Sequence, residues 1–181
     1  NPDAPLALGS LTHGTGGVLL DGALGIQVQG NYAYIVSNAA HSFQVIGISD
    51  PANPTVLGSI AESSDPTGLA LTGAATLFIQ GNYAYIASGE GLQIINISNP
   101  SLPVAVSNIV DSGTAALSGA FDVFVQGSYA YVASLGESAL QVIDVSNPAT
   151  PTFGDTFRDN GDVLLGQATS VYVRGNNAYM T

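Results

Sequence analysis

Cysteine and lysine are absent from the 181 residues of the chain, and arginine occurs only as Arg158 and Arg174. Without cysteine the chain has no disulfides, no thiolate metal sites and no cysteine nucleophile. Thirteen acidic residues give it a formal net charge of -11. Because nucleic acids and anionic membrane surfaces are also negatively charged, we expect neither as a partner. Cations and positively charged surfaces are the expected electrostatic partners.

Long apolar runs and helical periodicity are absent as well. No apolar stretch approaches the roughly 18 residues of a membrane-spanning helix, so no membrane span is predicted. Apolar residues make up 46% of the chain, charged residues 8%, and glycine occurs 22 times, a composition typical of a globular all-β protein with many turns. Low charge and abundant Ser, Thr, Gly and Asn favour an extracellular or cell-surface location. The chain begins at Asn1-Pro2, and we expect a mature or excised segment.

Two sequence markers recur at nearly the same interval. The first, Gly-x-Tyr-Ala-Tyr, steps by 51, 46 and 48 residues, and its last copy is altered. Its copies begin at Gly30, Gly81, Gly127 and Gly175. The second marker, an Asx-Pro-x-x-Pro turn, steps by 49, 49 and 48 residues. Its copies begin at Asn1, Asp50, Asn99 and Asn147. Two independent markers with one period predict tandem structural units.

Each unit is predicted to contain four strands, because β-branched and aromatic residues alternate along short stretches bounded by turn residues. First strands are predicted at residues 26–29, 77–80, 123–126 and 171–174. Second strands carry the Gly-x-Tyr-Ala-Tyr marker, whose first two residues favour a tight hairpin. Third strands, apolar on both faces, are predicted at residues 43–48, 92–97 and 140–145. Fourth strands follow the proline turn, at residues 6–11, 55–60, 104–110 and 152–157.

Four short strands in a unit of about 48 residues are typical of a β-propeller blade.

A leucine recurs in the connection between units, and we expect it to be buried. Its copies are Leu20, Leu71, Leu117 and Leu165. Tyrosines recur in the second strands, which favours packing between blades over a platform for stacking carbohydrate. They are Tyr32, Tyr34, Tyr83, Tyr85, Tyr129, Tyr131 and Tyr179.

The repeated stretches resemble the LVIVD repeat family over nearly the whole chain. The matching stretches are Gly-Asn-Tyr-Ala-Tyr-Ile-Ala-Ser, Gly-Leu-Gln-Ile-Ile-Asn-Ile-Ser-Asn-Pro and Leu-Gln-Val-Ile-Asp-Val-Ser-Asn-Pro. The resemblance implies an all-β β-propeller of four-stranded antiparallel blades in a bacterial or archaeal surface or secreted protein, and it implies no single activity. Such repeats often carry an acid before the first strand, kept here only as Asp122, where Gly25, Thr76 and Ser170 stand in the other units. A third-strand acid is kept only as Asp144.

The predicted organisation is one β-propeller domain over residues 1–181, or a segment of a larger one. Its units are residues 1–22 (the last strand of a blade plus a connection), 23–73, 74–119, 120–167 and the incomplete 168–181. The terminal unit has no predicted third strand, and an open sheet edge is costly. Three arrangements follow: part of a larger ring, a near-closed ring of four units, or an arrangement in which another chain supplies the missing strand.

Acidic residues in the connections after the fourth strands are predicted to share one rim. They are Glu62, Asp65, Asp111, Asp159 and Asp162. Asp159-Asn160-Gly161-Asp162 offers hard oxygen ligands on a tight loop, so Asp159 and Asp162 are candidate calcium ligands. The alternative is a solvated turn, since the spacing is not that of an EF-hand. No other cofactor is predicted.

No catalytic constellation is predicted. His13 and His41 fall at non-equivalent places in the repeat and lack metal-ligand spacing. The chain has no Gly-x-Ser-x-Gly motif. We therefore predict a non-enzyme.

The predicted function is an extracellular or cell-surface scaffold for protein interaction or structural assembly. Its partners would be other proteins or copies of itself, with cations or glycans as further ligands. One alternative is a hydrolase or lyase acting on extracellular polymers, which requires acids or a histidine converging in one pocket. Another is a surface-layer or filament subunit in which strands are exchanged between copies.

Overall fold

The computed structural model describes residues 6–62, 68–113, 115–161 and 165–181. They form three four-stranded antiparallel sheets and one hairpin, each with its strands in chain order. The first blade contains β1 (Ala23–Gln29), β2 (Tyr32–Ser37), β3 (Ser42–Gly47) and β4 (Thr55–Ala61). The second contains β5 (Thr76–Gln80), β6 (Tyr83–Ser88), β7 (Gly91–Asn96) and β8 (Val104–Val110). The third contains β9 (Ala120–Gln126), β10 (Tyr129–Ser134), β11 (Ala139–Asp144) and β12 (Thr152–Arg158). The hairpin is β13 (Val171–Arg174) and β14 (Asn177–Met180).

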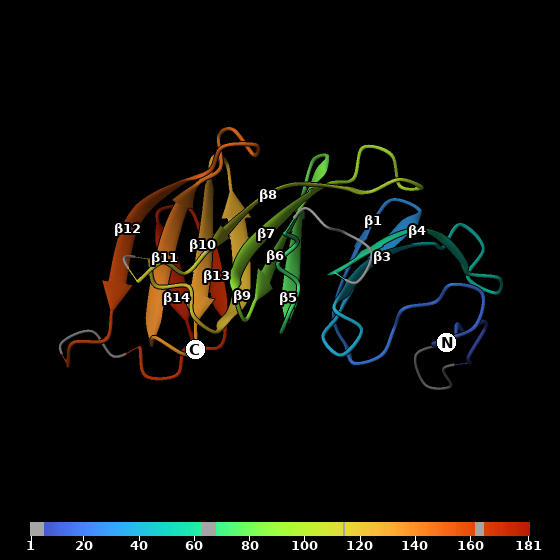
Figure 1. The fold of residues 1–181 in the computed structure, drawn as a ribbon, viewed down its shortest axis with the longest axis horizontal. Coiled ribbons are helices and arrows are strands. Elements are labelled where there is room, and N and C mark those ends of the chain that lie inside the picture. Colours follow the sequence, from blue (N-terminus) through green and yellow to red (C-terminus); the bar gives the residue numbers. More distant parts are fainter. Residues whose placement is uncertain (1–5, 63–67, 114, 162–164) are drawn as a thin grey trace.

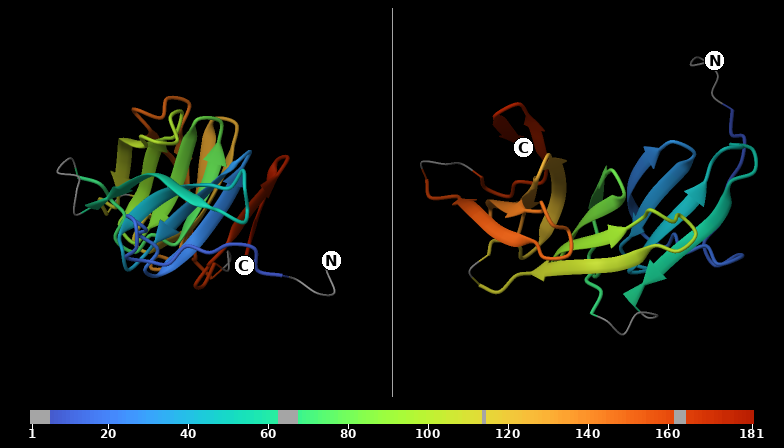
Figure 2. Two further views of the ribbon diagram at one scale, coloured as in Figure 1. Left: turned by 90° about the vertical axis from the view of Figure 1, so that its right-hand side faces the viewer. Right: turned by 90° about the horizontal axis from the view of Figure 1, so that it is seen from above.

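The sheets follow one another in chain order, from the blue first blade to the red hairpin (Figure 1). Seen from above they form an open arc, with the first blade at one end and the hairpin at the other (Figure 2). The first strands β1, β5, β9 and β13 lie side by side in that order. This is the arrangement of β-propeller blades, so the predicted fold class is confirmed.

Tight hairpins join the first and second strands of all four units. The glycine of the repeated marker has a positive φ of 60° or 61° at Gly30, Gly81, Gly127 and Gly175, a conformation that other residues rarely adopt. The following strands pair directly, as in the contact of Ala130 with Val125 on one side and Ile143 on the other. The marker therefore fixes the register of each blade.

Three apolar cores lie between successive sheets. The first joins Tyr34 and Phe43 of the first blade to Leu77 and Ile86 of the second. Equivalent cores join the second blade to the third and the third blade to the hairpin. In the connections, Leu71 and Leu117 are fully buried, as predicted, and Leu20 and Leu165 are partly buried. Each blade is thus stabilised chiefly by its neighbours.

The strand predicted at residues 6–11 is wrong, because this segment has no regular secondary structure and belongs to no described sheet. It still occupies the place of a fourth strand. A side chain at Gly9 would meet the carbonyl oxygen of Pro51 at 2.7 Å, as one at Gly58 would meet that of Pro100 at 2.7 Å. A ladder needs a partner strand, and no described strand lies at the third-strand position beside this segment.

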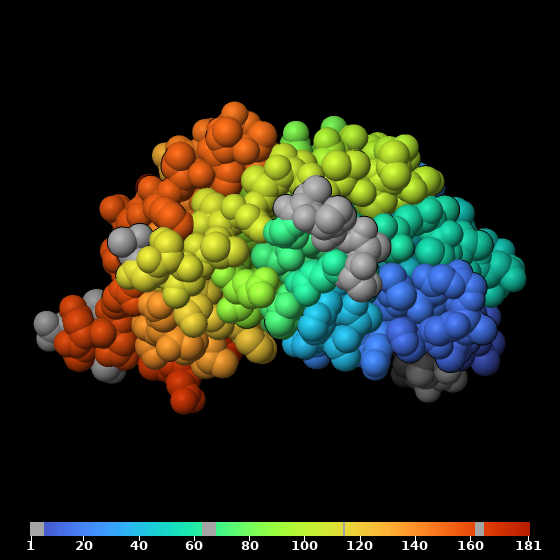
Figure 3. All heavy atoms as spheres, viewed as in Figure 1, coloured from blue at the N-terminus to red at the C-terminus, as the bar shows by residue number. Residues whose placement is uncertain are grey.

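No helix among the described residues is long and apolar enough to cross a membrane. In the space-filling view the N-terminal residues (blue) and the C-terminal residues (orange and red) lie toward opposite ends of the molecule (Figure 3).

Candidate interaction surface

Glutamine side chains connect the ends of neighbouring first strands. Gln29 Nε2 donates to the carbonyl oxygen of Gly81 at 3.2 Å, and Gln80 Nε2 donates to that of Gly127 at 2.9 Å. Gln126 Nε2 makes the same bond to Gly175 at 2.8 Å. The bond therefore recurs at every interface between described units.

Asp122 joins three units through its carboxylate. Oδ1 accepts from Thr76 Oγ1 at 3.0 Å and from its neighbour Val123 N at 2.9 Å. Oδ2 accepts from Ser170 Oγ at 3.0 Å and from Val171 N at 2.9 Å. Thr76 and Ser170 stand where the repeat often carries an acid, and here they donate to the one acid that is kept. Asp122 thus has a structural role on the inner side of the arc.

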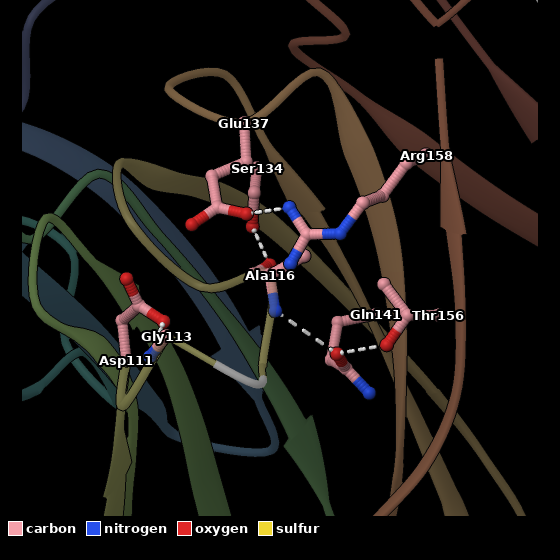
Figure 4. Close-up of polar contacts among 8 residues, drawn as sticks. All are labelled: Asp111, Gly113, Ala116, Ser134, Glu137, Gln141, Thr156 and Arg158. Atoms are coloured by element: carbon pink, nitrogen blue, oxygen red, sulfur yellow. Dashed lines mark hydrogen bonds and ion pairs between the residues drawn. The ribbon is translucent and has the colours of Figure 1, made fainter. Parts of the chain in front are cut away.

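Sequence reasoning missed a second recurring glutamine, which is buried in the middle of each third strand. Gln141 Oε1 accepts from Ala116 N at 3.1 Å and from Thr156 Oγ1 at 2.7 Å (Figure 4). Gln44 and Gln93 make the same bond to the connection that packs on them, at 3.1 Å and 2.9 Å. The signal was present in the sequence, since these residues are 49 and 48 positions apart.

An aromatic groove opens on the third blade where the hairpin does not cover it. The hairpin packs on Leu140 and partly on Tyr131, while Phe153 and Phe157 of β12 are 45% and 50% exposed. Two adjoining cavities of about 450 and 560 Å³ meet there. Both are lined by Tyr131, Val142 and Phe157. We call this surface the aromatic groove, defined by Tyr129, Tyr131, Val142, Phe153 and Phe157.

The groove borders the fourth unit, of which the structure describes two strands. Between the first and second blades, the core includes Ile95 from the third strand of the second blade. Between the second and third blades, the core includes Ile143 from the third strand of the third blade. At the third blade that position is open beside β14, whose only partner among the described strands is β13. The groove is thus next to a strand edge that no described strand pairs with.

The tyrosine prediction holds only where a neighbour covers the ring. Tyr34 and Tyr85 are each 2% exposed in the cores between blades, and burial raises the pKa of both phenols. Packing between blades is not seen for Tyr129, which is 46% exposed, and Tyr179 is 54% exposed beside the last described strand. No described strand covers them, so their recurrence in the repeat does not lead to burial.

The groove carries negative charge at one end. Asp144 and Asp155 line it, and Asp144 Oδ1 accepts from Ser146 N at 2.8 Å. The hydrogen bonds from Ser146 hold the pKa of the Asp144 carboxyl below its ordinary value, so this group is ionised at neutral pH. The surface therefore combines apolar rings with fixed carboxylates.

The described acidic residues that were predicted to share a rim accept hydrogen bonds from the connections around them. Asp111 Oδ1 accepts from Gly113 N at 3.0 Å (Figure 4). Glu62 accepts from the amide of Leu71 and from Thr72 Oγ1 at 2.9 Å. Asp65 lies outside the described residues. Among the residues that are described, no group of three or more acidic or histidine side chains is placed to hold a metal ion.

Of the two predicted calcium ligands, the structure describes Asp159. Asp159 Oδ1 accepts from Gly161 N and Oδ2 from Leu165 N, both at 3.1 Å. Asp162 lies outside the described residues, so calcium binding by this pair stays a prediction. The nearby cation Arg158 pairs with Glu137 (Figure 4).

The two histidines lie in separate contacts. His13 Nδ1 accepts from Leu20 N at 3.1 Å, and His41 Nδ1 lies 3.2 Å from Glu62 Oε2. Neither belongs to the aromatic groove.

Comparison with solved structures supports the propeller assignment. The chain is similar to the computationally designed Ika4 protein, at 12% identity and a TM-score of 0.65 over 98% of this chain and 92% of that one. It is similar to Kuenenia stuttgartiensis hydrazine synthase, at 16% identity and a TM-score of 0.63 over 90% of this chain and 42% of that one. It is also similar to the β-propeller domain of Cps50 (Swd1) from Myceliophteria thermophila, at 10% identity and a TM-score of 0.60 over 82% and 46%.

At these identities the similarity establishes the fold alone. The chain spans nearly all of Ika4 and less than half of the other two proteins. Since one of them is named as an enzyme, the fold does not decide between enzyme and scaffold.

The family is identified from sequence. No curated protein matches the chain, but the family model of the LVIVD repeat matches residues 22–62, 72–111 and 119–159. These matches cover more than half of the chain, and each spans one four-stranded blade. The chain therefore belongs to the LVIVD repeat family, and its blades are those of a β-propeller.

Proposed function

We propose that this chain is a non-enzymatic scaffold for protein interaction, at the cell surface or outside the cell, which binds an extended segment of a partner in the aromatic groove. The observations that carry the proposal are the exposed rings of Phe153 and Phe157 in the groove and the edge of β14 that pairs with no described strand. Strand addition supplies main-chain hydrogen bonds along such an edge, while side-chain pockets beside it select alternate residues.

The chain itself indicates which segment fits. In all three complete blades the second strand pairs with a third strand of the pattern Leu or Phe, Gln, Val or Ile, then Ile. A partner strand added to β14 would take that same position. Its inward apolar residues would cover Val142 and Phe157, as Ile95 and Ile143 cover the preceding blades.

The extracellular location rests on composition. Charged residues are 8% of the chain, and Ser, Thr, Gly and Asn are abundant. A hydrolase or lyase is the alternative considered from sequence, and the groove lining contains two carboxylates, Asp144 and Asp155, but no histidine. Uncovered aromatic rings fit an apolar partner segment better than a reacting polymer.

A synthetic peptide with the sequence of residues 138–147, which includes β11, tests the proposal. We expect it to bind the chain with micromolar Kd in fluorescence anisotropy, and a scrambled peptide to bind at least tenfold more weakly. Phe157→Ser should weaken binding by about 10- to 100-fold, because burial of one such ring contributes about 1.5–3 kcal/mol.

Leu102→Ser is the matched control, since Leu102 is also exposed but does not line the groove. It should leave the Kd unchanged. Equal binding of the scrambled peptide, or full binding by Phe157→Ser, would contradict the proposal.

A further inference from the structure

A polar pocket of about 410 Å³ lies between the first and second blades, in each of which all four strands are described. Its walls come from the β1–β2 hairpin, the end of β3, the start of β4 and the proline turn of the second blade. Its volume is within the usual range of ligand pockets, roughly 300–1,000 Å³. We call it the interblade pocket, defined by Asn31, Tyr32, Gly47, Ser49, Thr55 and Ser101.

The proline turn that forms one wall is packed directly on the sheet of the first blade. A side chain at Gly58 of β4 would meet the carbonyl oxygen of Pro100 at 2.7 Å. At the next interface Ser107 stands at the position of Gly58, and its hydroxyl donates to the carbonyl oxygen of Pro148 at 2.6 Å. The contact between turn and sheet therefore recurs, and this wall belongs to the interface between blades.

Gly47 keeps the floor of the pocket open. In the sheet it lies between Tyr32 of β2 and Thr55 of β4, and residues directly opposite one another point to the same face. A Cβ added at Gly47 would meet Thr55 Oγ1 at 3.1 Å and Leu57 Cδ1 at 3.3 Å. Since both of these residues line the pocket, a longer side chain at Gly47 would extend into it.

The glycine also leaves a backbone donor without the acceptor that the repeat supplies elsewhere. In the other two blades the equivalent residues are Asn96 and Asp144. Their Oδ1 atoms accept from the amides two residues further on, Ser98 N and Ser146 N, each at 2.8 Å. The equivalent amide is Ser49 N, and no described group accepts from it. A ligand oxygen in the pocket can take the place of that Oδ1 atom.

Three side chains add polar groups to the same pocket. They are the amide of Asn31 and the hydroxyl groups of Thr55 and Ser101. No hydrogen bond among the described residues uses these side-chain atoms. Amide and hydroxyl side chains can both donate and accept. Hydroxyl groups of a ligand, which also do both, are therefore their matching partners.

Tyr32 supplies an aromatic wall that is held in place. Its ring packs against the core between the two blades and lies edge-on to Tyr34, with ring centroids 6.4 Å apart. The same residue lines the pocket. A ring fixed on one side can contact an apolar ligand face on the other at little further cost in entropy.

The lining of the pocket is uncharged, since none of the described residues that form it is acidic or basic. Next to it in sequence, Asp50 has a carboxyl pKa lowered by hydrogen bonds from Asn53 and Ala52, so this group is ionised at neutral pH. An anionic ligand would find no cation in the lining and a carboxylate nearby. These charges favour a neutral ligand.

We infer that the interblade pocket binds a neutral sugar, with hydroxyl groups of one hexose ring on Ser49 N and the polar side chains and its apolar face on Tyr32. A pyranose ring combines hydroxyl groups around its rim with an apolar face of C–H groups, which matches the few polar groups and the aromatic wall. The site is particular to this interface, because Val104 and Ala149 stand at the next one in place of Thr55 and Ser101. It lies apart from the aromatic groove, so the inference goes beyond the proposed function and does not rest on it.

Saturation-transfer difference NMR with three simple sugars tests the inference. The probes are methyl β-glucopyranoside, methyl β-galactopyranoside and methyl α-mannopyranoside. We expect at least one of them to bind the chain with a millimolar Kd, because a single ring makes few contacts. Glucuronic acid, which adds a carboxylate to the same kind of ring, should bind more weakly, since the lining offers it no cation.

Three substitutions copy into the pocket the residues that the chain has at the next interface, so each variant should fold. Gly47→Asn extends a side chain into the pocket and should weaken binding by about tenfold or more, while Thr55→Val and Ser101→Ala each remove one hydroxyl and should weaken it about three- to tenfold. Thr152→Val makes the same change as Thr55→Val in the third blade and should leave the Kd unchanged. Thermal unfolding checks that all four variants are folded.

A lack of saturation transfer from all three glycosides would overturn the inference, as would equal binding by Gly47→Asn and the wild type. Tighter binding of glucuronic acid would overturn the assignment to neutral sugars. The peptide of residues 138–147 should not displace the sugar, and displacement would place the sugar in the aromatic groove and contradict the inference. The two sites share no lining residue, so failure of peptide binding leaves the sugar site standing, and failure of sugar binding leaves the proposed function standing.

Discussion

At the scale of single residues, Asp122 is unusual because its one carboxylate accepts hydrogen bonds from residues of three units. Its four donors come from β5, β9 and the start of β13. The repeat positions of Thr76 and Ser170 are occupied by hydroxyl groups, which can donate to a carboxylate where a second acid would repel it.

Asp122→Ala should destabilise the chain by about 2–4 kcal/mol, since charged hydrogen bonds contribute about 1.5–3 kcal/mol and their donors would lose a partner. Urea denaturation measures the loss. Asp21→Ala removes the same charge at an exposed position and should change the free energy of unfolding by less than about 0.5 kcal/mol. Equal losses in the two variants would show that net charge, and not bonding between units, sets the effect.

The calcium prediction for Asp159 and Asp162 also belongs to this scale. Both oxygens of Asp159 already accept amide hydrogens, so a cation would use their remaining lone pairs. If the site binds, millimolar calcium chloride raises Tm, EDTA reverses the rise, and Asp159→Asn abolishes it. An unchanged Tm in calcium would contradict the prediction.

At the scale of elements, the third strand is where each blade binds its connection. The buried amide of Gln141 fixes both the connection through Ala116 and the fourth strand through Thr156. Gln44 and Gln93 do the same for their connections. An apolar strand with one central glutamine therefore positions the loops of the rim.

Gln141→Leu should cost about 2–4 kcal/mol, because it leaves the amide of Ala116 and the hydroxyl of Thr156 without their acceptor. Thr156→Val removes only one of these donors and should cost about 1 kcal/mol. Thermal and urea unfolding measure both. A loss in Gln141→Leu no larger than that in Thr156→Val would show that the contact with the connection contributes nothing.

The repeat made the strands predictable, because a period shared by two markers fixes where each blade begins. It could also have shown the recurring glutamines, which the apolar pattern of the third strand concealed. It could not show which repeated residues are buried. Tyr85 and Tyr179 are equivalent in sequence, yet only Tyr85 has a described neighbour to cover it. The prediction of a strand at residues 6–11 was wrong for a related reason, since no described strand pairs with this segment.

At the scale of the whole molecule, the arc is a stack of units that contact only their neighbours. Its stability is then close to a sum over blades and interfaces. The first blade and the hairpin each have one described neighbour, whereas the second and third blades have two.

The bonds made by Asp122 also bear on how such a chain could be rearranged by recombination. Gly25 lets the first and second blades approach closely, since a side chain there would meet Ala75 O and Thr76 Cα at 2.9 Å. Asp122 in turn requires hydroxyl donors on both sides. If the second and third blades exchanged places, Asp122 would face Gly25 on one side, which has no side-chain donor and leaves little room, and only Thr76 would remain as a hydroxyl donor on the other side. Similar blades are therefore not interchangeable parts, and their order along the gene is fixed by the residues of the inner strands.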